Sequence, residues 1–144
     1  MQEGDGTTPD PPSPGTTEHV RTVHPPDGEI APIIKGEYEH ANATGRQLVV
    51  YLGATWCEPC QRFHRAVDHG DLDAAFPKLT LLEFDADHDQ ERLRSAGYSS
   101  RYIPMFALPK ADGTASGKQV EGGIKGDGAV SYVSDKLKGL LAKN

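Results

Sequence analysis

Sulfur and long apolar runs are scarce in this chain of 144 residues. It has two cysteines and two methionines, and no stretch approaches the roughly 20 consecutive apolar residues that a membrane-spanning helix needs. It also has no long basic run, and its formal net charge is −6. We therefore expect no membrane insertion and no binding to nucleic acid, because anionic membranes and nucleic acids both attract basic surfaces. The length suits a single domain.

Apolar residues are also scarce in the first 28 residues, which contain six prolines and, beyond Met1, only Val20 and Val23 as aliphatic side chains. Such a segment cannot bury enough apolar surface to offset the entropy that it loses on ordering. We therefore expect residues 1–28 to be a disordered tail or linker and residues 29–144 to form the domain. The chain shows no apolar signal-peptide core, but a tail of this composition suits a tether. We expect a periplasmic or other extracytoplasmic location, with the cytoplasm as the alternative.

The rest of the chain alternates between strand and helix patterns. Leu48 to Leu52 is a continuous apolar run, typical of a strand buried on both faces. A helix follows from about Cys57, with Pro59 in its first turn. Later patterns predict a strand over 79–86, a short helix capped by Asp87, a hairpin of strands 105–108 and 119–121, and a helix from about residue 127. This order predicts an α/β fold with a mixed four- to five-stranded sheet and helices on both faces.

The two cysteines, Cys57 and Cys60, stand three positions apart in the stretch ATWCEPCQRFH. A zinc site would need further ligands, and although His64 and His69 follow, four ligands on one short helix cannot easily surround a tetrahedral ion. A structural disulfide across two residues would close too small a loop to constrain the unfolded chain much. A C-x-x-C beside a βαβ pattern is typical of a redox pair. We therefore favour a redox pair, expect no metal or other cofactor, and keep a metal carrier as the weaker alternative.

The strand before the pair delivers Cys57 to the start of a helix. Unpaired backbone N–H groups and the helix dipole favour a thiolate there, and such sites lower a cysteine pKa from about 8.5. Cys57 is thus the expected nucleophile, and Cys60, one turn further in, is the expected resolving cysteine. Trp56 would form an apolar platform beside the exposed sulfur, or would be an ordinary core tryptophan.

Two motifs carry a resemblance to a known family. The run LVVYLGATWCEPC and the later Tyr102-Ile103-Pro104-Met105-Phe106 resemble the thioredoxin superfamily, with similarity from about Arg46 to Leu141. The resemblance implies a thioredoxin fold and a protein thiol–disulfide oxidoreductase. Such an enzyme would reduce or exchange disulfides in protein partners, and an upstream thiol reductant or recycling protein would restore it. It also implies that the Ile103–Pro104 bond is cis, and that Trp56, Ile103 and Pro104 contact the substrate.

The segment TGRQLVVYLGATWCEPCQRFH is most similar to the exported single-domain and DsbD C-terminal-like branch of this superfamily. That branch implies an extracytoplasmic address, and we expect a monomer. The alternative function is a redox-inactive binding module with the same fold. Reduction of insulin in the presence of dithiothreitol would distinguish the two.

The chain departs from the thioredoxin pattern at two positions near the pair. Thioredoxin has a buried aspartate six residues before its first cysteine and a lysine on the next strand, where this chain has Tyr51 and Glu83. Tyr51 is a poor base, since the reference pKa of tyrosine is about 10. Alternation along the strand places Glu83 with Leu81 and Asp85, and a position beneath the active-site helix would let Glu83 accept a proton. The alternative is that Glu83 faces solvent at the strand edge or pairs with a lysine or arginine.

Two further side chains are candidates for tuning the pair. Glu58, between the cysteines, places a like charge near the Cys57 thiolate, which disfavours ionisation and makes the pair somewhat more reducing. We expect this effect to be small, because Glu58 should face solvent. His64 lies one helical turn after Cys60 on the same face, where it could titrate near neutrality and modulate the pair. The alternative for His64 is an ordinary solvated helix position.

Overall fold

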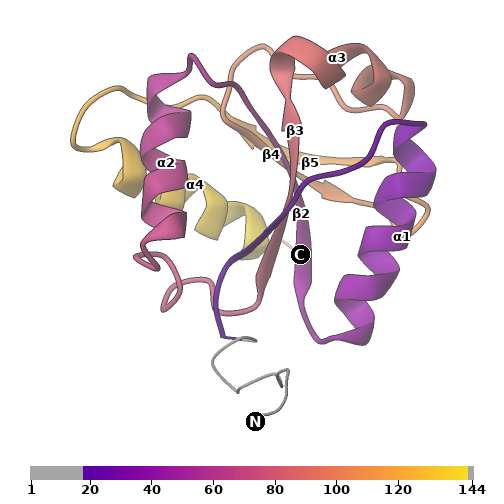
Figure 1. Cartoon of the computed structure of the whole chain (residues 1–144), viewed down its shortest axis with the longest axis horizontal. Coiled ribbons are helices and arrows are strands. Elements are labelled where there is room, and N and C mark those ends of the chain that lie inside the picture. The colour runs from indigo at the N-terminus through magenta and orange to yellow at the C-terminus, as the bar shows by residue number, and fades with distance from the viewer. Residues whose placement is uncertain (1–17, 143–144) are drawn as a thin grey trace, which may run out of the picture.

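Five strands form one mixed sheet in residues 18–142, the part of the chain that the computed structural model describes. The sheet order is β1-β3-β2-β4-β5, and helices cover both faces (Figure 1). β3 runs parallel to β1 and β2, whereas β4 is antiparallel to β2 and β5. The elements in chain order are β1 (Arg21–Val23), α1 (Ile30–Ala43), β2 (Gln47–Gly53), α2 (Glu58–Asp68), β3 (Leu79–Asp85), α3 (Ala86–Ser95), β4 (Met105–Pro109), β5 (Ala115–Glu121) and α4 (Ala129–Ala142). This arrangement confirms the predicted fold class.

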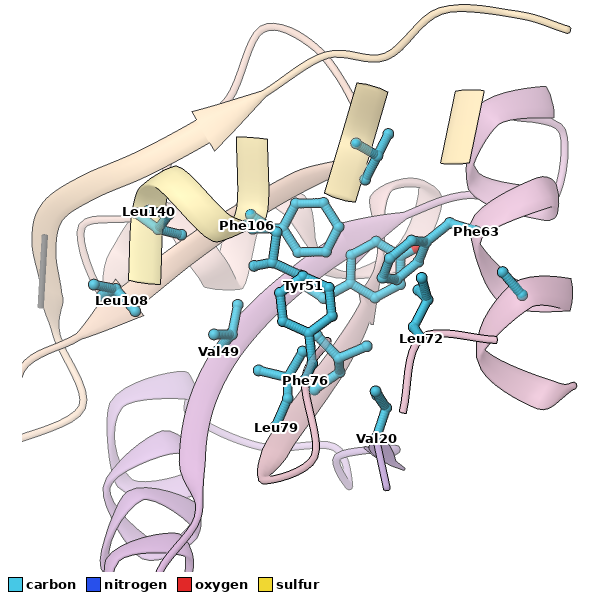
Figure 2. Close-up of a cluster of buried hydrophobic side chains, with 14 residues drawn as sticks. Val20, Val49, Tyr51, Phe63, Leu72, Phe76, Leu79, Phe106, Leu108 and Leu140 are labelled. Carbon is cyan, nitrogen blue, oxygen red and sulfur yellow. The ribbon is translucent and has the colours of Figure 1, made fainter. Parts of the chain in front are cut away.

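The central strand β2 is buried on both faces, as its apolar run predicts. One face contributes Val49 and Tyr51 to a core that also contains side chains of α2 and α4 (Figure 2). There the Tyr51 ring stacks on Phe106 at 5.0 Å between centroids and meets the edge of Phe63 at 5.5 Å. The other face belongs to a second core, which includes residues of α1 and α3. The aromatic cluster fixes the side of β2 that lies beneath the active-site helix α2.

The expected boundary at Gly28 is wrong for residues 18–28, whereas residues 1–17 lie outside the described residues. Val20 is 5% exposed and belongs to the core of Figure 2, and its N–H donates to Asp73 Oδ1 at 3.0 Å. β1 then pairs with β3 in parallel, Arg21 opposite Thr80. An edge strand of three residues depends chiefly on backbone hydrogen bonds, so a low apolar content does not prevent it from joining a sheet.

The helix α3 begins earlier than the sequence predicts. Asp85, the last residue of β3, is its N-cap, and its carboxylate accepts the N–H of Asp87 at 3.2 Å. The expectation that Asp87 caps this helix is therefore wrong. The strand passes directly into the helix, so the first carboxylate beyond the apolar run already meets the unpaired N–H groups.

Candidate active site

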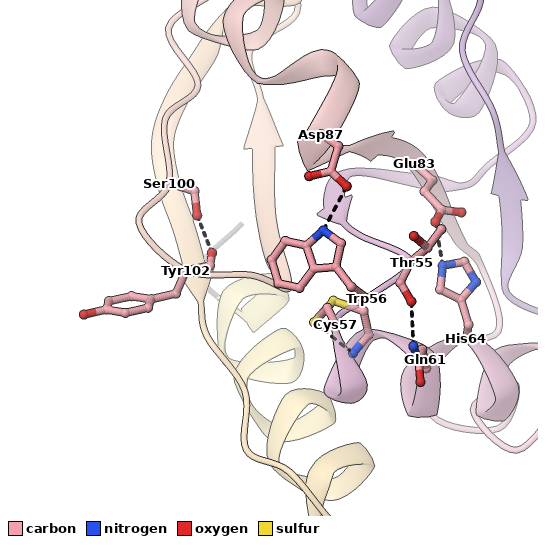
Figure 3. Close-up of a disulfide and its surroundings, with 10 residues drawn as sticks. Thr55, Trp56, Cys57, Gln61, His64, Glu83, Asp87, Ser100 and Tyr102 are labelled. Atoms are coloured by element: carbon pink, nitrogen blue, oxygen red, sulfur yellow. Dashed lines mark hydrogen bonds and ion pairs between the residues drawn. A yellow bond between two sulfur atoms is a disulfide. The ribbon is translucent and has the colours of Figure 1, made fainter.

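The cysteine pair occupies the junction between β2 and α2. Cys57 is the N-cap of α2, and Pro59 lies in the first turn, where a missing N–H costs nothing. The two cysteines form a disulfide with their Cα atoms 5.2 Å apart (Figure 3). Cys57 Sγ also accepts the N–H of Cys60 at 3.3 Å. Cys57 is 6% exposed and Cys60 is 1% exposed, so Cys57 is the more accessible of the two.

Large apolar side chains are exposed on the segments around the disulfide. Trp56 is 64% exposed, and its indole N–H donates to Asp87 Oδ2 at 2.8 Å (Figure 3). The alternative of a core tryptophan is therefore wrong. Tyr102, which precedes the Ile103–Pro104 bond, is 62% exposed, and Ile124 is 42% exposed. Exposed aromatic and aliphatic side chains beside a reactive pair are typical of a surface that binds other proteins.

Pro104 is buried and immediately precedes β4, and the Ile103–Pro104 peptide bond is cis. The Pro104 carbonyl accepts the N–H of Gly122 at 2.9 Å. A Cβ on the next residue, Gly123, would lie 2.9 Å from Pro59 Cβ and 3.2 Å from Pro104 Cδ. The segment after β5 thus approaches both prolines closely, and only a glycine leaves the necessary space.

The carboxylate of Glu121 holds the loop that precedes Pro104. Its Oε1 accepts the backbone N–H groups of Arg101 at 2.8 Å and Tyr102 at 3.0 Å, and its Oε2 accepts from Gln119. The hydroxyl of Ser100 donates to the Tyr102 carbonyl and helps to close the same loop (Figure 3). Burial alone would raise the pKa of Glu121, but the hydrogen bonds from Arg101 and Tyr102 outweigh it and lower that pKa.

Glu58 is paired rather than simply facing solvent. Its side chain is 34% exposed, and its Oε2 accepts from Arg62 Nε at 2.8 Å. Its other oxygen accepts the N–H of Gly126 at 3.2 Å. The hydrogen bond from Arg62 lowers the pKa of Glu58, so the carboxylate stays ionised. Because the Arg62 charge lies close to it, the negative field that Glu58 exerts on Cys57 is weaker than a free carboxylate would produce.

Glu83 and His64 are in contact, which the sequence did not predict. Glu83 Oε2 lies 2.5 Å from His64 Nε2, and the Glu83 side chain is 17% exposed (Figure 3). The second oxygen, Oε1, lies 3.2 Å from His24 Nε2 without hydrogen-bond geometry. The hydrogen bond to Glu83 outweighs partial burial and raises the pKa of His64. All three side chains line a cavity of about 560 Å³ beside the start of α2.

The position of Glu83 follows from the sheet register. Glu83 lies opposite Tyr51 on β2, and Leu81 on the same face packs in the core beneath α2. Both alternatives for Glu83 are wrong, because its side chain is mostly buried and its contacts are with histidines, not with a lysine or arginine. His24 escaped notice because it stands in the proline-rich segment, and a lone histidine there carries no signal of its own.

Within residues 18–142, no group of three or more histidine, cysteine or acidic side chains is placed to hold a metal ion. His64, the first of the two histidines considered as zinc ligands, instead bonds to Glu83. No helix in the same range has the length and apolar character to cross a bilayer.

The comparisons with known proteins agree with this site. Residues 33–111 match the sequence model of the family described as "Thioredoxin-like". The protein "Thioredoxin H-type" of Chlamydomonas reinhardtii is 31% identical over 114 residues, which cover 79% of this chain and 84% of that protein. Thioredoxin of Trichomonas vaginalis has the same fold, with a TM-score of 0.53, 20% identity and coverage of 85% of this chain and 97% of that one.

Spinach chloroplast thioredoxin f, in its short form, is similar in fold with a TM-score of 0.51 and 20% identity, covering 88% of this chain and 94% of that one. The two solved structures show only a shared fold. The family match and the relative of 31% identity show membership of the family itself. The cysteine pair at the start of α2 supplies the chemistry. The chain belongs to the thioredoxin superfamily and is a protein thiol–disulfide oxidoreductase.

Proposed function

We propose that this oxidoreductase reduces disulfides in protein substrates, with Cys57 as the nucleophile and Cys60 as the resolving cysteine. The observation that carries the proposal is the placement of Cys57. It caps α2, its sulfur accepts the Cys60 N–H at 3.3 Å, and it is the more exposed of the two cysteines. A helix N-terminus and an N–H donor both favour the thiolate over the thiol. The same N–H would therefore stabilise the attacking form of Cys57 after reduction.

The reaction proceeds in two exchanges. The Cys57 thiolate attacks one sulfur of a substrate disulfide, a mixed disulfide forms, and the other substrate sulfur leaves with the electron pair. Cys60 then loses its proton and attacks Cys57 Sγ. The bond between Cys57 and the substrate breaks, and the second substrate sulfur leaves as a thiolate that takes up a proton. The protein is left with the Cys57–Cys60 disulfide, and an upstream thiol reductant must restore the dithiol.

The pair of Glu83 and His64 is the proposed acceptor for the Cys60 proton. His64 is one turn beyond Cys60 on α2, and its ring is bonded to a carboxylate that is mostly buried. The carboxylate makes the neutral imidazole a stronger base, and the fraction of His64 that is neutral can accept the Cys60 proton. The cavity that both side chains line offers the proton a route to solvent.

The substrate would bind across the exposed face beside the disulfide. Trp56 supplies an apolar surface, and the backbone of Ile103 next to Pro104 can pair with an extended segment of the substrate. Glu58 tunes the pair weakly, because its charge is shared with Arg62. The Glu121 carboxylate fixes the loop that presents Ile103 and Pro104.

We further propose that the chain acts as a monomer in the periplasm or another extracytoplasmic compartment, in the manner of the exported and DsbD C-terminal-like branch. Support comes from the similarity of TGRQLVVYLGATWCEPCQRFH to that branch and from the proline-rich segment ahead of the domain. Fractionation of the native host with an antibody to this chain tests the location. Recovery in the cytosolic fraction alone would contradict it.

The experiment that tests the function is reduction of insulin by the full chain with dithiothreitol as the source of electrons. We expect insulin to precipitate several times faster than with dithiothreitol alone, and Cys57→Ser to abolish the acceleration. An unaccelerated reaction with an intact, reducible Cys57–Cys60 disulfide would favour the binding module. Titration against glutathione gives the reduction potential of the pair, and a value near about −270 mV would place it with reductants, whereas one near about −120 mV would place it with oxidants.

A further inference from the structure

Three buried side-chain polar atoms lack a hydrogen-bond partner among the described residues: Tyr51 Oη, Glu83 Oε1 and Ser134 Oγ. Leaving such a group unpaired lowers the free energy of unfolding, so buried polar groups in native proteins are rarely left without a partner unless they have a role. Tyr51 and Glu83 lie opposite each other across β2 and β3, on the face beneath α2. Glu83 is already in contact with two histidines, whereas the Tyr51 hydroxyl has no hydrogen-bond partner within residues 18–142.

The Tyr51 hydroxyl and the Cys60 sulfur border the same small space. A Cβ built on Gly53 would lie 2.8 Å from Tyr51 Oη and 3.4 Å from Cys60 Sγ. Gly53 does not have a positive φ, so its backbone conformation is open to other residues. What glycine provides here is the room in which the hydroxyl and the sulfur come near each other. The Tyr51 ring cannot easily turn away, because Phe63, His64 and Phe106 pack around it.

We propose that the Tyr51 hydroxyl donates a hydrogen bond to the Cys60 sulfur whenever that sulfur is not in the disulfide. Within the disulfide, the sulfur is held in the bond to Cys57 and is a poor acceptor. Once that bond is broken, the Cys60 side chain can rotate, and a thiolate accepts a hydrogen bond far better than a disulfide sulfur does. Burial, and after it the charge of Glu83, raises the pKa of Tyr51 well above its ordinary value. The hydroxyl therefore keeps its proton and serves as a donor, not as a base.

This role rests on the proposed assignment of Cys60 as the resolving cysteine. In the resolving step Cys60 gives its proton to the acceptor pair of Glu83 and His64. The thiolate then forms a bond to Cys57 Sγ while the substrate sulfur leaves with its electron pair. Tyr51 gains and loses nothing in this step, and its hydrogen bond stabilises the thiolate before attack. The hydrogen bond is made in the reduced form and lost in the oxidised form, so it also raises the reduction potential of the pair.

The test compares Tyr51→Phe with Tyr98→Phe in the full chain. Both tyrosines are 1% exposed, but the Tyr98 hydroxyl donates to the Gly113 carbonyl at 2.9 Å, remote in sequence from the pair. The measured quantity is the equilibrium between dithiol and disulfide forms in glutathione buffers at one pH. We expect Tyr51→Phe to shift this equilibrium about tenfold toward the disulfide, which is a potential about 30 mV lower. We expect Tyr98→Phe to lower stability and leave the equilibrium unchanged.

An unchanged equilibrium in Tyr51→Phe would overturn the proposal, because a hydroxyl bonded only to water would affect both redox forms equally. Equal shifts in both variants would also overturn it, since they would reflect general loosening of the core. If Tyr51→Phe does not fold, ultraviolet resonance Raman spectra of the wild type decide. A tyrosine that gains a hydrogen-bond acceptor on reduction supports the proposal, and identical tyrosine bands in both redox forms contradict it. These measurements need no protein substrate, so they stand apart from the insulin assay.

Discussion

His64 Nε2 lies 2.5 Å from Glu83 Oε2, and this contact joins α2 to β3 one helical turn beyond Cys60. The hydrogen bond raises the pKa of His64, so the protonated ring is favoured in the folded state. Its contribution to stability is then full below the unfolded pKa of about 6.5 and is lost as the pH rises through the higher folded value. The His64 side chain is 38% exposed, so solvent screening limits the contribution to about 0.5 kcal/mol.

We therefore expect His64→Gln to lose more free energy of unfolding at pH 6 than at pH 9. Urea denaturation of the wild type and the variant at both pH values measures the difference. His24→Gln is the matched control, because His24 is 75% exposed and its contact with Glu83 lacks hydrogen-bond geometry. Its effect should be smaller at both pH values. A loss in His64→Gln that is the same at pH 6 and pH 9 would contradict the assigned charge state.

The second prediction concerns the order of the two cysteines. Cys60→Ser should accumulate mixed disulfides with substrate proteins, because Cys57 can still attack but nothing resolves the product. Cys57→Ser should accumulate far fewer, because Cys60 is only 1% exposed. Non-reducing gels of each variant after incubation with oxidised insulin count the adducts. Similar amounts from the two variants would show that Cys60 is also a competent nucleophile, against the proposed roles.

The third prediction concerns Val20, ahead of the edge strand β1. Val20 is 5% exposed and packs in the core beneath α2, so Val20→Ala should cost about 1.5 kcal/mol of unfolding free energy. Val23→Ala is the control, because Val23 is only partly buried, and it should cost clearly less. Denaturant unfolding of both variants gives the two values. Equal and negligible losses would mean that the segment before α1 contributes little to the stability of the domain.

The sequence predicts the strand, turn and helix around the cysteines because each signal there is local. The apolar run of β2, Pro59 in the first turn and the C-x-x-C spacing can all be recognised without knowing the fold. The strand β1 escapes such reasoning. Its three residues pair with Thr80 to Leu82, which lie far along the chain, and the stabilising contacts are backbone hydrogen bonds that leave little trace in composition.

In the candidate site, too, local patterns predict some features, whereas others depend on how the elements pack together. Alternation along β3 places Glu83 on the same face as Leu81, and the structure shows that this face lies beneath α2. That His64 would be its partner depends on how α2 packs over the sheet, which no local pattern reveals. The space shared by Tyr51 and Cys60 is a further case, because it depends on Gly53 and on the rotamer of a ring in the core.

The fourth prediction concerns the carboxylate that holds the loop before Pro104. Glu121→Gln weakens the hydrogen bonds from the Arg101 and Tyr102 N–H groups, so the loop that presents Ile103 should lose order. We expect KM for insulin to rise about threefold with little change in kcat. Glu91→Gln, which alters an exposed carboxylate on α3, is the control. A fall in kcat without a change in KM would place the defect in the chemical steps instead.

The pH dependence gives the same prediction a second readout. The pKa of Glu121 is lowered in the folded protein, so its contribution to stability is present above the unfolded pKa of about 4.3. That contribution is lost as the pH falls through the lower folded value. The difference in unfolding free energy between wild type and Glu121→Gln should therefore shrink between about pH 5 and pH 3. A difference that is constant over this range would show that the carboxylate charge is not what holds the loop.

The final prediction concerns the glycine that lets the segment after β5 approach the two prolines. A Cβ at Gly123 would lie 2.9 Å from Pro59 Cβ and 3.2 Å from Pro104 Cδ, and neither ring can rotate out of the way. Gly123→Ala should therefore push the segment away from the active site, at a cost of about 1–3 kcal/mol. Insulin reduction should slow as well, because Pro59 lies between the cysteines and Pro104 belongs to the proposed substrate surface.

The same substitution at Gly36 should have the opposite effect on stability. Gly36 lies within α1, has no positive φ, and a Cβ there would have no neighbour within 4 Å. Alanine is the better helix former, so Gly36→Ala should stabilise the protein by about 0.5–1 kcal/mol and leave insulin reduction unchanged. Thermal unfolding and the insulin assay on both variants measure the two signs. Should Gly123→Ala be as stable and as active as Gly36→Ala, the close approach of this segment to Pro59 and Pro104 would not matter for the site.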